Sequence, residues 1–298
     1  MSLRVQILGA AAGGGLPQWN CGCANCTAAR AGRVPPLTQS SIAASADGRR
    51  WLIVNASPDL REQMARTPEL HPAQLRGSPI AAVLVTNADV DHVGGLLTLR
   101  ERTPFDLVAT VEVHAMLDAN PVFEVLDRRL VTRRTLALGA PVEAPPGLEI
   151  EAFAAPGKTP LWRETGAAAT RTLGEGTVGV ELRAGGRRVV HVPGCAAMTP
   201  DLAARLRGAH LVLFDGTVFR DDEMIAAGTG EKTGARMGHM AMAGPDGSLA
   251  AFRDIEVGRK VYVHMNNTNP VLDPASAERA EVEAVGWTVG ADGMEFRP

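Results

Sequence analysis

Short apolar runs, bounded by glycine, proline and polar residues, recur along this chain of 298 residues. The first run, residues 5–8, ends in a glycine-rich turn, and we expect it to be a strand. Runs at 40–46 and 51–55 flank Asp47-Gly48, and this combination predicts a β-hairpin. The run at 80–86 is almost entirely apolar, which is typical of a buried strand.

Strands and helical segments then alternate in both halves of the chain. Further strands are predicted at 108–113, 148–153, 176–183, 188–192, 211–214 and 261–264, and a final pair, 288–289 and 294–296, surrounds a turn. Helices are predicted at 58–64, 96–101, 122–129, 201–206 and 275–285. This order predicts an α/β fold in which two sheets pack face to face with helices outside, an αββα sandwich. We expect one domain, 1–298, with two pseudo-repeat halves that meet near 141–146.

Composition narrows the classes of protein that fit this pattern. The formal net charge is -3, and no basic tract of the kind that binds nucleic acid is present. No stretch approaches the roughly 20 apolar residues that span a bilayer. The first residues lead directly into a strand, without the apolar region of a secretory signal. We therefore expect a cytoplasmic protein with no nucleic-acid or membrane partner.

Acidic and histidine side chains follow three of the predicted buried strands. Asp89, Asp91 and His92 come directly after one strand, while Asp215 and His264 stand at the ends of two others. Ligands of α/β proteins bind at the carboxyl ends of strands, and both residue types donate lone pairs to divalent cations. The convergence of these side chains from three strands favours a metal site over the alternative, an Asx-rich turn with a solvated histidine. For Asp215, a cap on the following turn is an equal alternative.

Three of the four cysteines, Cys21, Cys23 and Cys26, lie within six residues. Thiolates at this spacing favour a structural zinc, which needs a fourth ligand from elsewhere in the fold. The alternative is a set of reduced, buried thiols. His239 lies in a methionine-rich loop, where it could serve as an acid–base group or simply be packed or solvated.

Several motifs together resemble a known family. The segment Asp89-x-Asp91-His92-x-Gly94-Gly95 is similar to a degenerate form of the metallo-β-lactamase motif His-x-His-x-Asp-His. More specific motifs occupy residues 13–26, 39–43, 55–59, 237–240 and 264–270. Together they resemble the B proteins of pyrroloquinoline quinone (PQQ) biosynthesis, within the metallo-β-lactamase superfamily, over nearly the whole chain. The resemblance implies the αββα sandwich.

The chain departs from the dinuclear metal site that this resemblance implies. Asn87 and Asp89 stand where the first two histidines of the motif belong, and Gly194 stands where a bridging Asp is usual. Residues 172–177 contain no histidine, although the additional one would fall there. One of the two metal positions is therefore expected to be lost.

The ligands of the other metal position, Asp91, His92 and His264, remain. Two histidines and one carboxylate form the triad of non-heme Fe(II) oxygenases. We therefore predict a mononuclear Fe(II)- and O₂-dependent hydroxylase rather than a two-metal hydrolase. The pathway of the resembling family implies a small substrate, a tyrosine-derived intermediate of the cross-linked Glu–Tyr precursor.

The resemblance also implies roles for the neighbouring residues. Asp89 and Asp215 are expected to orient histidine ligands or to accept protons. His239 matches the loop histidine that is a general acid in tRNA-processing relatives, and here it would contact substrate or relay a proton. A phosphodiesterase relative binds structural zinc through the same cysteine spacing and a later histidine. Asn267 stands near the place of that fourth ligand, whose identity stays open.

Two other functions stay open at this point. One is a metal-dependent hydrolase that trims the precursor peptide, and the other is a non-catalytic carrier of PQQ or its precursor. The oligomeric state is also open, with a homodimer as one alternative.

Overall fold

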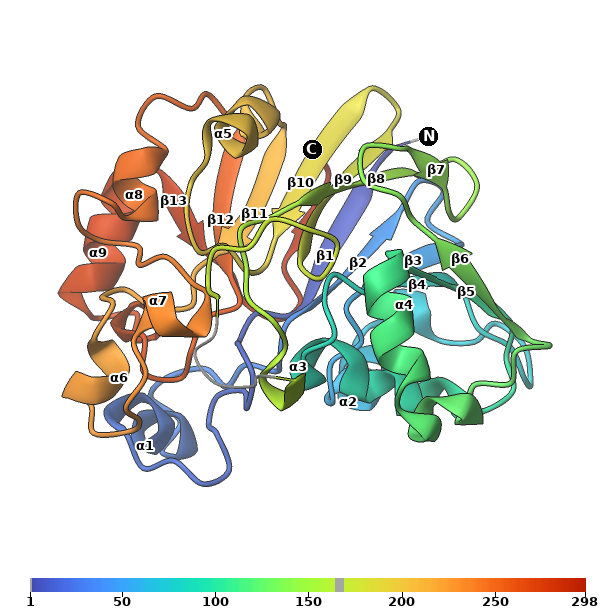
Figure 1. Cartoon of the computed structure of the whole chain (residues 1–298). Coiled ribbons are helices and arrows are strands. Elements are labelled where there is room, and N and C mark those ends of the chain that lie inside the picture. Colours follow the sequence, from blue (N-terminus) through green and yellow to red (C-terminus); the bar gives the residue numbers. More distant parts are fainter. Residues whose placement is uncertain (1, 164–168) are drawn as a thin grey trace.

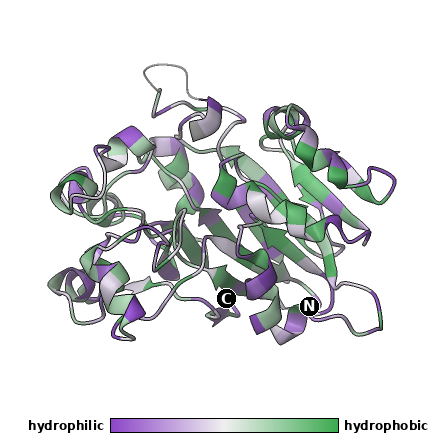
Figure 2. Cartoon of the chain, turned by 90° about the horizontal axis from the view of Figure 1, so that it is seen from below, coloured by the Kyte–Doolittle hydropathy of each residue, from purple (hydrophilic) through white to green (hydrophobic). Residues whose placement is uncertain are grey.

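The computed structural model of the chain describes residues 2–163 and 169–298. In that part of the chain, the strands form two sheets of seven that lie face to face, with helices on their outer sides (Figure 1). Hydrophobic residues concentrate on the strands in the middle of the molecule, while hydrophilic residues are frequent in the surrounding helices and loops (Figure 2). The predicted αββα sandwich is confirmed.

The first sheet contains the predicted hairpin around Asp47-Gly48. Its strands, in spatial order, are β14 (Glu295–Phe296), β1 (Arg4–Gly9), β2 (Ser41–Ser45), β3 (Trp51–Val54), β4 (Ile80–Leu84), β5 (Phe105–Ala109) and β6 (Val131–Thr135). Strands β14 to β3 pair antiparallel, and β3 to β6 pair parallel. The parallel strands therefore end at a common edge of the sheet.

The second sheet repeats this plan. Its strands, in spatial order, are β13 (Trp287–Val289), β12 (Arg259–Val263), β11 (Leu211–Asp215), β10 (Arg187–Val192), β9 (Val178–Ala184), β8 (Glu149–Ala154) and β7 (Val142–Glu143). Strands β7 to β10 pair antiparallel, and β10 to β13 pair parallel. Here too, β11 and β12 end at one edge.

The helices of the described residues are short. The α-helices are α1 (Ala24–Arg30), α2 (Leu60–Arg66), α3 (Val90–Val93), α4 (Val111–Asp118), α5 (Pro200–Leu206), α6 (Glu223–Ala226), α7 (Gly234–Met237), α8 (Ser248–Ala251) and α9 (Ala277–Ala284). The 3₁₀-helices are η1 (Pro68–Leu70), η2 (Gly94–Arg100), η3 (Pro121–Val125), η4 (Leu161–Arg163) and η5 (Pro270–Leu272). None of these described helices has the length and apolarity needed to cross a lipid bilayer.

The main hydrophobic core lies between the two sheets. Leu52 and Leu84 of the first sheet and Val180 and Leu213 of the second belong to it, and all four are fully buried. Burial of one such side chain contributes about 1.5–3 kcal/mol, so this layer is the main source of stability. A second core, which includes Leu60 of α2, covers the outer face of the first sheet.

The prediction of a strand over 108–113 is wrong in its second half. Strand β5 ends at Ala109, and α4 begins at Val111. The Oγ1 atom of Thr110 accepts a hydrogen bond from the backbone N–H of Val113, and this cap starts the helix despite the β-branched residues. The helices predicted at 96–101 and 122–129 are the 3₁₀-helices η2 and η3 rather than α-helices.

The final two strands do not pair with each other. β13 extends the second sheet beside β12, and β14 extends the first sheet beside β1. The turn between them is anchored to the first sheet through Asp292, whose carboxylate accepts hydrogen bonds from the N–H of Ala10 (3.0 Å) and from the N–H (2.8 Å) and Oγ1 (2.7 Å) of Thr38.

We expect Asp292→Ala to lower the free energy of unfolding by about 2–3 kcal/mol, because two backbone N–H groups would lose a charged acceptor. Urea unfolding followed by circular dichroism measures this change. Asp246→Ala, at an exposed acidic position, is the control and should stay within about 0.5 kcal/mol of the unmodified protein. Equal unfolding midpoints for the two variants would contradict the anchoring role of Asp292.

Candidate metal centre

The predicted site residues converge between the two sheets, near the ends of three strands. α3 follows β4 in the first sheet, whereas His264 follows β12 in the second. Both α3 and α7 lie at the lower end of the sheets in Figure 1. A cavity of about 330 Å³ opens there and is lined by Asp89, Asp91, His92, His239 and His264, among others.

Asp91, His92 and His264 bring their donor atoms within 4.8 Å of one another. The Oδ2 atom of Asp91 lies 3.1 Å from Nε2 of His264 and 3.8 Å from Nε2 of His92. Among the described residues, the buried Nε2 of His92 has no hydrogen-bond partner. A buried polar atom without a partner is costly, and a cation would use its lone pair. One carboxylate and two imidazoles therefore fit a divalent metal ion.

The electrostatics of Asp91 and His92 agree with this fit, whereas at His264 a cation would have to displace a proton. Burial acts to raise the pKa of Asp91, but the imidazoles of His92 and His264 outweigh it and hold that pKa well below its usual range. Burial lowers the pKa of His92. Burial acts in the same direction on His264, but its hydrogen bond to Asp91 outweighs burial and raises the pKa. An ionised carboxylate next to a neutral imidazole of His92 is ready to bind a cation.

The backbone of His264 has a φ of 58°, in the left-handed region that side chains other than glycine rarely adopt. Such a conformation costs on the order of 1–3 kcal/mol and persists only when the surroundings enforce it. Here the next residue, Met265, donates its N–H to Ala10 (3.0 Å) and accepts from Ala12 (2.8 Å). The glycine-rich N-terminal loop therefore fixes the direction in which the His264 ring points.

A second set of possible donors, Asp215, His239 and His264, also lies within 4.8 Å. The hydroxyl of Thr217 lies among them, 2.7 Å from Oδ1 of Asp215, 3.0 Å from Nδ1 of His239 and 2.9 Å from Nδ1 of His264. A second cation on these donors would need the place of this hydroxyl. In addition, Nδ1 of His239 lies 2.7 Å from Oδ2 of Asp215. This set is therefore a hydrogen-bonded network.

The positions of the missing ligands also line the cavity. Asn87 and Asp89 form part of its wall, and Oδ2 of Asp89 lies 3.7 Å from Nζ of Lys158. A Cβ atom at Gly194 would come within 3.6 Å of His239, which is an ordinary contact. Lys232 lines the same cavity. The wall that would hold a second metal therefore carries lysine cations.

The sulfur atoms of Cys21, Cys23 and Cys26 lie within 4.8 Å of one another, at the N-terminal end of α1. The side-chain amide nitrogen of Asn267 lies 3.1, 3.5 and 3.3 Å from the three sulfurs, in that order. Burial, together with the neighbouring sulfurs of Cys21 and Cys26, raises the pKa of the Cys23 thiol to about 11. A bound cation would stabilise the thiolate form of these cysteines. The cluster therefore suits a zinc ion, with Asn267 next to the fourth position.

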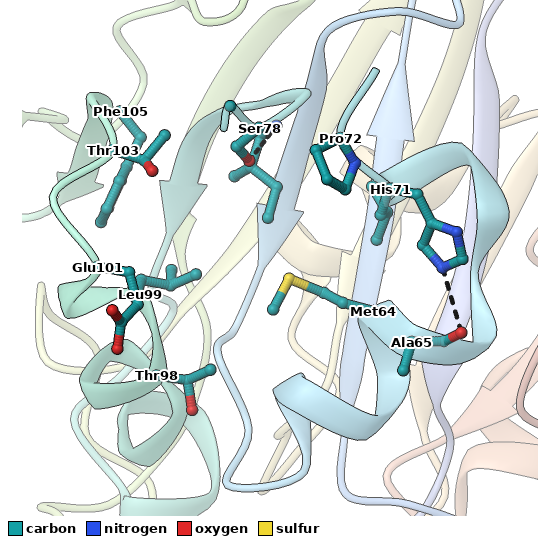
Figure 3. A pocket seen from close by; sticks show the side chains of 13 residues that line it. Met64, Ala65, His71, Pro72, Ser78, Thr98, Leu99, Glu101, Thr103 and Phe105 are labelled. Carbon is teal, nitrogen blue, oxygen red and sulfur yellow. Dashed lines mark hydrogen bonds between the residues drawn. The ribbon is translucent and has the colours of Figure 1, made fainter. Parts of the chain in front are cut away.

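A separate cavity of about 270 Å³ lies against η1 and η2 (Figure 3). Met64, Leu99 and Phe105 line it, so its wall is largely apolar. The ring of His71 points to the backbone oxygen of Ala65, 3.2 Å from Nε2, rather than into the cavity. Among the described residues, no set of three metal donors lies there.

Sequence reasoning missed the two threonines that contact the histidines of the site. Oγ1 of Thr86 lies 3.3 Å from Nδ1 of His92, and Oγ1 of Thr217 lies 2.9 Å from Nδ1 of His264. Both threonines follow buried strands that end at the site, and this position was the available signal. Lys158 and Lys232 also line the cavity, but they lie in irregular loops rather than after a predicted strand, so their place at the site had no signal in the sequence.

Comparison with known proteins gives consistent relatives. A model of the beta-lactamase superfamily domain matches residues 50–265. Coenzyme PQQ synthesis protein B of Methylorubrum extorquens is 56% identical over 295 residues, covering 98% of this chain and 99% of that protein. The protein of the same name from Ruegeria pomeroyi is 55% identical over 294 residues, covering 99% of each.

Solved structures of similar proteins agree with these sequence relatives. The crystal structure of Zn²⁺-bound PqqB from Methylobacterium extorquens matches with a TM-score of 0.97 and 56% identity, over 98% of this chain and 99% of that chain. A diphosphatase of the PhnP family matches with a TM-score of 0.71 at 16% identity, over 99% of this chain and 97% of that one, and so shares the fold. The chain therefore belongs to the coenzyme PQQ synthesis protein B family, within the beta-lactamase superfamily.

Proposed function

We propose that this protein acts in PQQ biosynthesis as a mononuclear Fe(II)- and O₂-dependent hydroxylase of a tyrosine-derived intermediate of the cross-linked Glu–Tyr precursor. One observation carries the proposal: Asp91, His92 and His264 converge within 4.8 Å, while the neighbouring donor set is filled by the Thr217 hydroxyl. Hydrolases of this superfamily usually employ two metals on an attacking water, whereas one iron with open positions suits oxygenation.

The triad residues would hold the iron through one carboxylate oxygen and two Nε2 atoms. Iron bound there would activate O₂ next to the substrate. One oxygen atom would enter the phenol ring and the other would leave as water, with two electrons from an added reductant such as ascorbate. The adjoining cavity of about 330 Å³ is within the usual range for a small-molecule site. Its wall would position the substrate next to the metal.

The two lysines of the cavity support the proposed substrate class. Lys158 and Lys232 both line the cavity that contains the triad. A substrate made from linked glutamate and tyrosine carries carboxylates, and an ammonium group binds these with charge-assisted hydrogen bonds. The lysines would thus fix the orientation of the phenol ring relative to the metal.

His239 supports an acid–base role during the reaction. Its Nδ1 lies 2.7 Å from Oδ2 of Asp215, so the Nδ1–H donates to that carboxylate and Nε2 keeps a lone pair. Because His239 lines the cavity, its Nε2 is suited to accept the proton of the substrate's phenol. Asp215 orients His239 and does not need to touch the substrate.

The names of the relatives support the pathway. Proteins 56% identical to this chain are named for coenzyme PQQ synthesis, and the chain and these relatives cover each other almost completely. The crystal structure of one relative contains Zn²⁺. In this chain we assign zinc to the cysteine cluster and Fe(II) to the triad.

We expect His92→Ala and His264→Ala to lose bound iron and hydroxylation, because each removes one imidazole of the triad. Anaerobic loading with Fe(II), followed by elemental analysis, oxygen uptake and the mass shift of the substrate, measures this. Zinc should stay near one equivalent. His210→Ala, at a histidine whose Nδ1 accepts a hydrogen bond from Arg188 outside the cavity, is the matched control.

Other outcomes would identify the alternatives. Two cations per chain at the triad, together with zinc-supported cleavage of the precursor peptide without O₂, would indicate a hydrolase. Tight binding of PQQ without turnover, unchanged by His92→Ala, would indicate a carrier.

We expect Cys26→Ser to remove zinc and to lower the thermal unfolding midpoint, while iron binding to the triad persists. Asn267→Asp provides the sharper test, because it places a carboxylate next to three sulfurs. That variant should melt lower than the unmodified protein when zinc is chelated and regain stability when zinc is added. Thermal unfolding with and without chelator measures both effects. If the unfolding midpoint of Asn267→Asp is the same with zinc and with chelator, the assignment of zinc to the cysteine cluster is wrong.

A further inference from the structure

Two buried threonines stand behind the two histidines of the triad. We propose that Thr86 and Thr217 are positioning residues, each of which holds one metal-binding histidine as the Nδ1–H tautomer so that its Nε2 lone pair faces the cation. This inference rests on the proposed metal site, and it concerns any divalent ion bound there.

Thr217 forms the first of these arrangements. Its backbone N–H (3.0 Å) and its hydroxyl (2.7 Å) both contact Oδ1 of Asp215. The same hydroxyl oxygen lies 2.9 Å from Nδ1 of His264. Asp215 is fully buried, and its other oxygen accepts from the N–H of Cys195 (2.8 Å) and lies 2.7 Å from Nδ1 of His239. The carboxylate is therefore surrounded by donors.

Thr86 forms the same arrangement in the other half of the chain. Its backbone N–H (2.9 Å) and its hydroxyl (3.0 Å) both contact Oδ1 of Asn55, and the hydroxyl lies 3.3 Å from Nδ1 of His92. Thr86 and Asn55 are fully buried. Asn55 has a φ of 64°, a left-handed conformation that asparagine tolerates better than most residues.

Counting protons assigns the tautomers. A hydroxyl has one proton to donate and two lone pairs that accept. Asp215 offers only acceptors, and Oδ1 of Asn55 must be the amide oxygen because it receives the N–H of Thr86. Thr86 can therefore give its proton to Oδ1 of Asn55, and Thr217 can give its proton to Oδ1 of Asp215 or to the backbone oxygen of His264 (2.9 Å). With any of these acceptors, a lone pair of the hydroxyl faces Nδ1 of the histidine. That nitrogen must then carry a hydrogen, so a cation binds at Nε2. The Nε2 atom of His92 has no hydrogen-bond partner among the described residues, and at His264 the cation would replace the hydrogen that Nε2 donates to Asp91 (3.1 Å).

The two arrangements differ in strength. The Thr217 hydroxyl contacts a carboxylate and lies 2.9 Å from Nδ1 of His264. The Thr86 hydroxyl contacts a neutral amide oxygen and lies 3.3 Å from Nδ1 of His92. Charge-assisted hydrogen bonds are roughly twice as strong as neutral ones. Thr217 also lies 3.0 Å from Nδ1 of His239, so it links a triad histidine to the acid–base residue. We therefore expect Thr217 to matter more than Thr86.

The test compares Thr217→Val and Thr217→Ser, with Thr86→Val and Thr86→Ser as the parallel pair. Binding of Co²⁺ at the triad is measured by competition with a chelator and by its visible absorption. Loss of an orienting partner typically weakens metal affinity 10- to 100-fold. We expect Thr217→Val to fall in this range, Thr86→Val to fall less, and both serine variants to stay within about threefold because they keep the hydroxyl.

Nitrogen-15 NMR of the histidine rings gives a second readout that a general loss of packing would not produce. With Zn²⁺ at the triad, His264 should show a protonated Nδ1 and a metal-bound Nε2, and the exchange-protected Nδ1–H signal should disappear in Thr217→Val. If the valine variant melts much lower, Thr217→Ala removes the hydroxyl without placing a methyl group against Asp215. Unchanged affinity and an unchanged Nδ1–H signal in the valine or alanine variant would overturn the inference.

The outcomes separate this inference from the proposed function. If the variants lose Co²⁺ affinity but the unmodified protein does not hydroxylate its substrate, the proposed function fails and the positioning role stands. If the protein hydroxylates and the variants bind Co²⁺ normally, only the positioning role fails.

Discussion

The carboxylate of Asp91 joins the two halves of the molecule, and the site depends on this contact. Asp91 follows a strand of the first sheet, whereas His264, 3.1 Å away, follows a strand of the second. These residues are 173 positions apart in the chain. The site therefore exists only when the two sheets are packed together, and the burial that stabilises the sandwich also removes the donors from water. Stability and metal binding have a common physical origin.

The surroundings of this contact favour one metal ion over two in the pocket. A second cation would need ligands at Asn87, Asp89 or Gly194, and these positions offer an amide, a carboxylate beside Lys158, and no side chain. The donors that could compensate are already bonded to a hydroxyl. The same fold thus supports different chemistry, because function depends on the side chains at the strand ends rather than on the sandwich.

Much of the fold was predictable because strands of this type are continuous apolar runs. The convergence of Asp91, His92 and His264 was predictable because these residues directly follow such runs. The errors in the predicted strands arose where local hydrogen bonds or distant strand pairing outweighed the sequence pattern. Thr110 caps a helix where valines favoured a strand. The last two strands pair with β12 and β1, which belong to different sheets, and β1 lies at the far end of the sequence. The hydroxyl of Thr217 could not be assigned to the site from sequence, since its partners come together only in three dimensions.

One short segment serves both metal positions. His264 belongs to the triad, and Asn267, three residues later, contacts all three cysteine sulfurs. Asn25, within the cysteine helix, donates to the backbone oxygen of Asn267 (3.0 Å) and to that of Asn269 (2.8 Å). An ion on the thiolates would stiffen the stretch of backbone that orients the imidazole of His264. Occupancy of the cysteine cluster would thereby influence how firmly Asp91, His92 and His264 hold a metal ion.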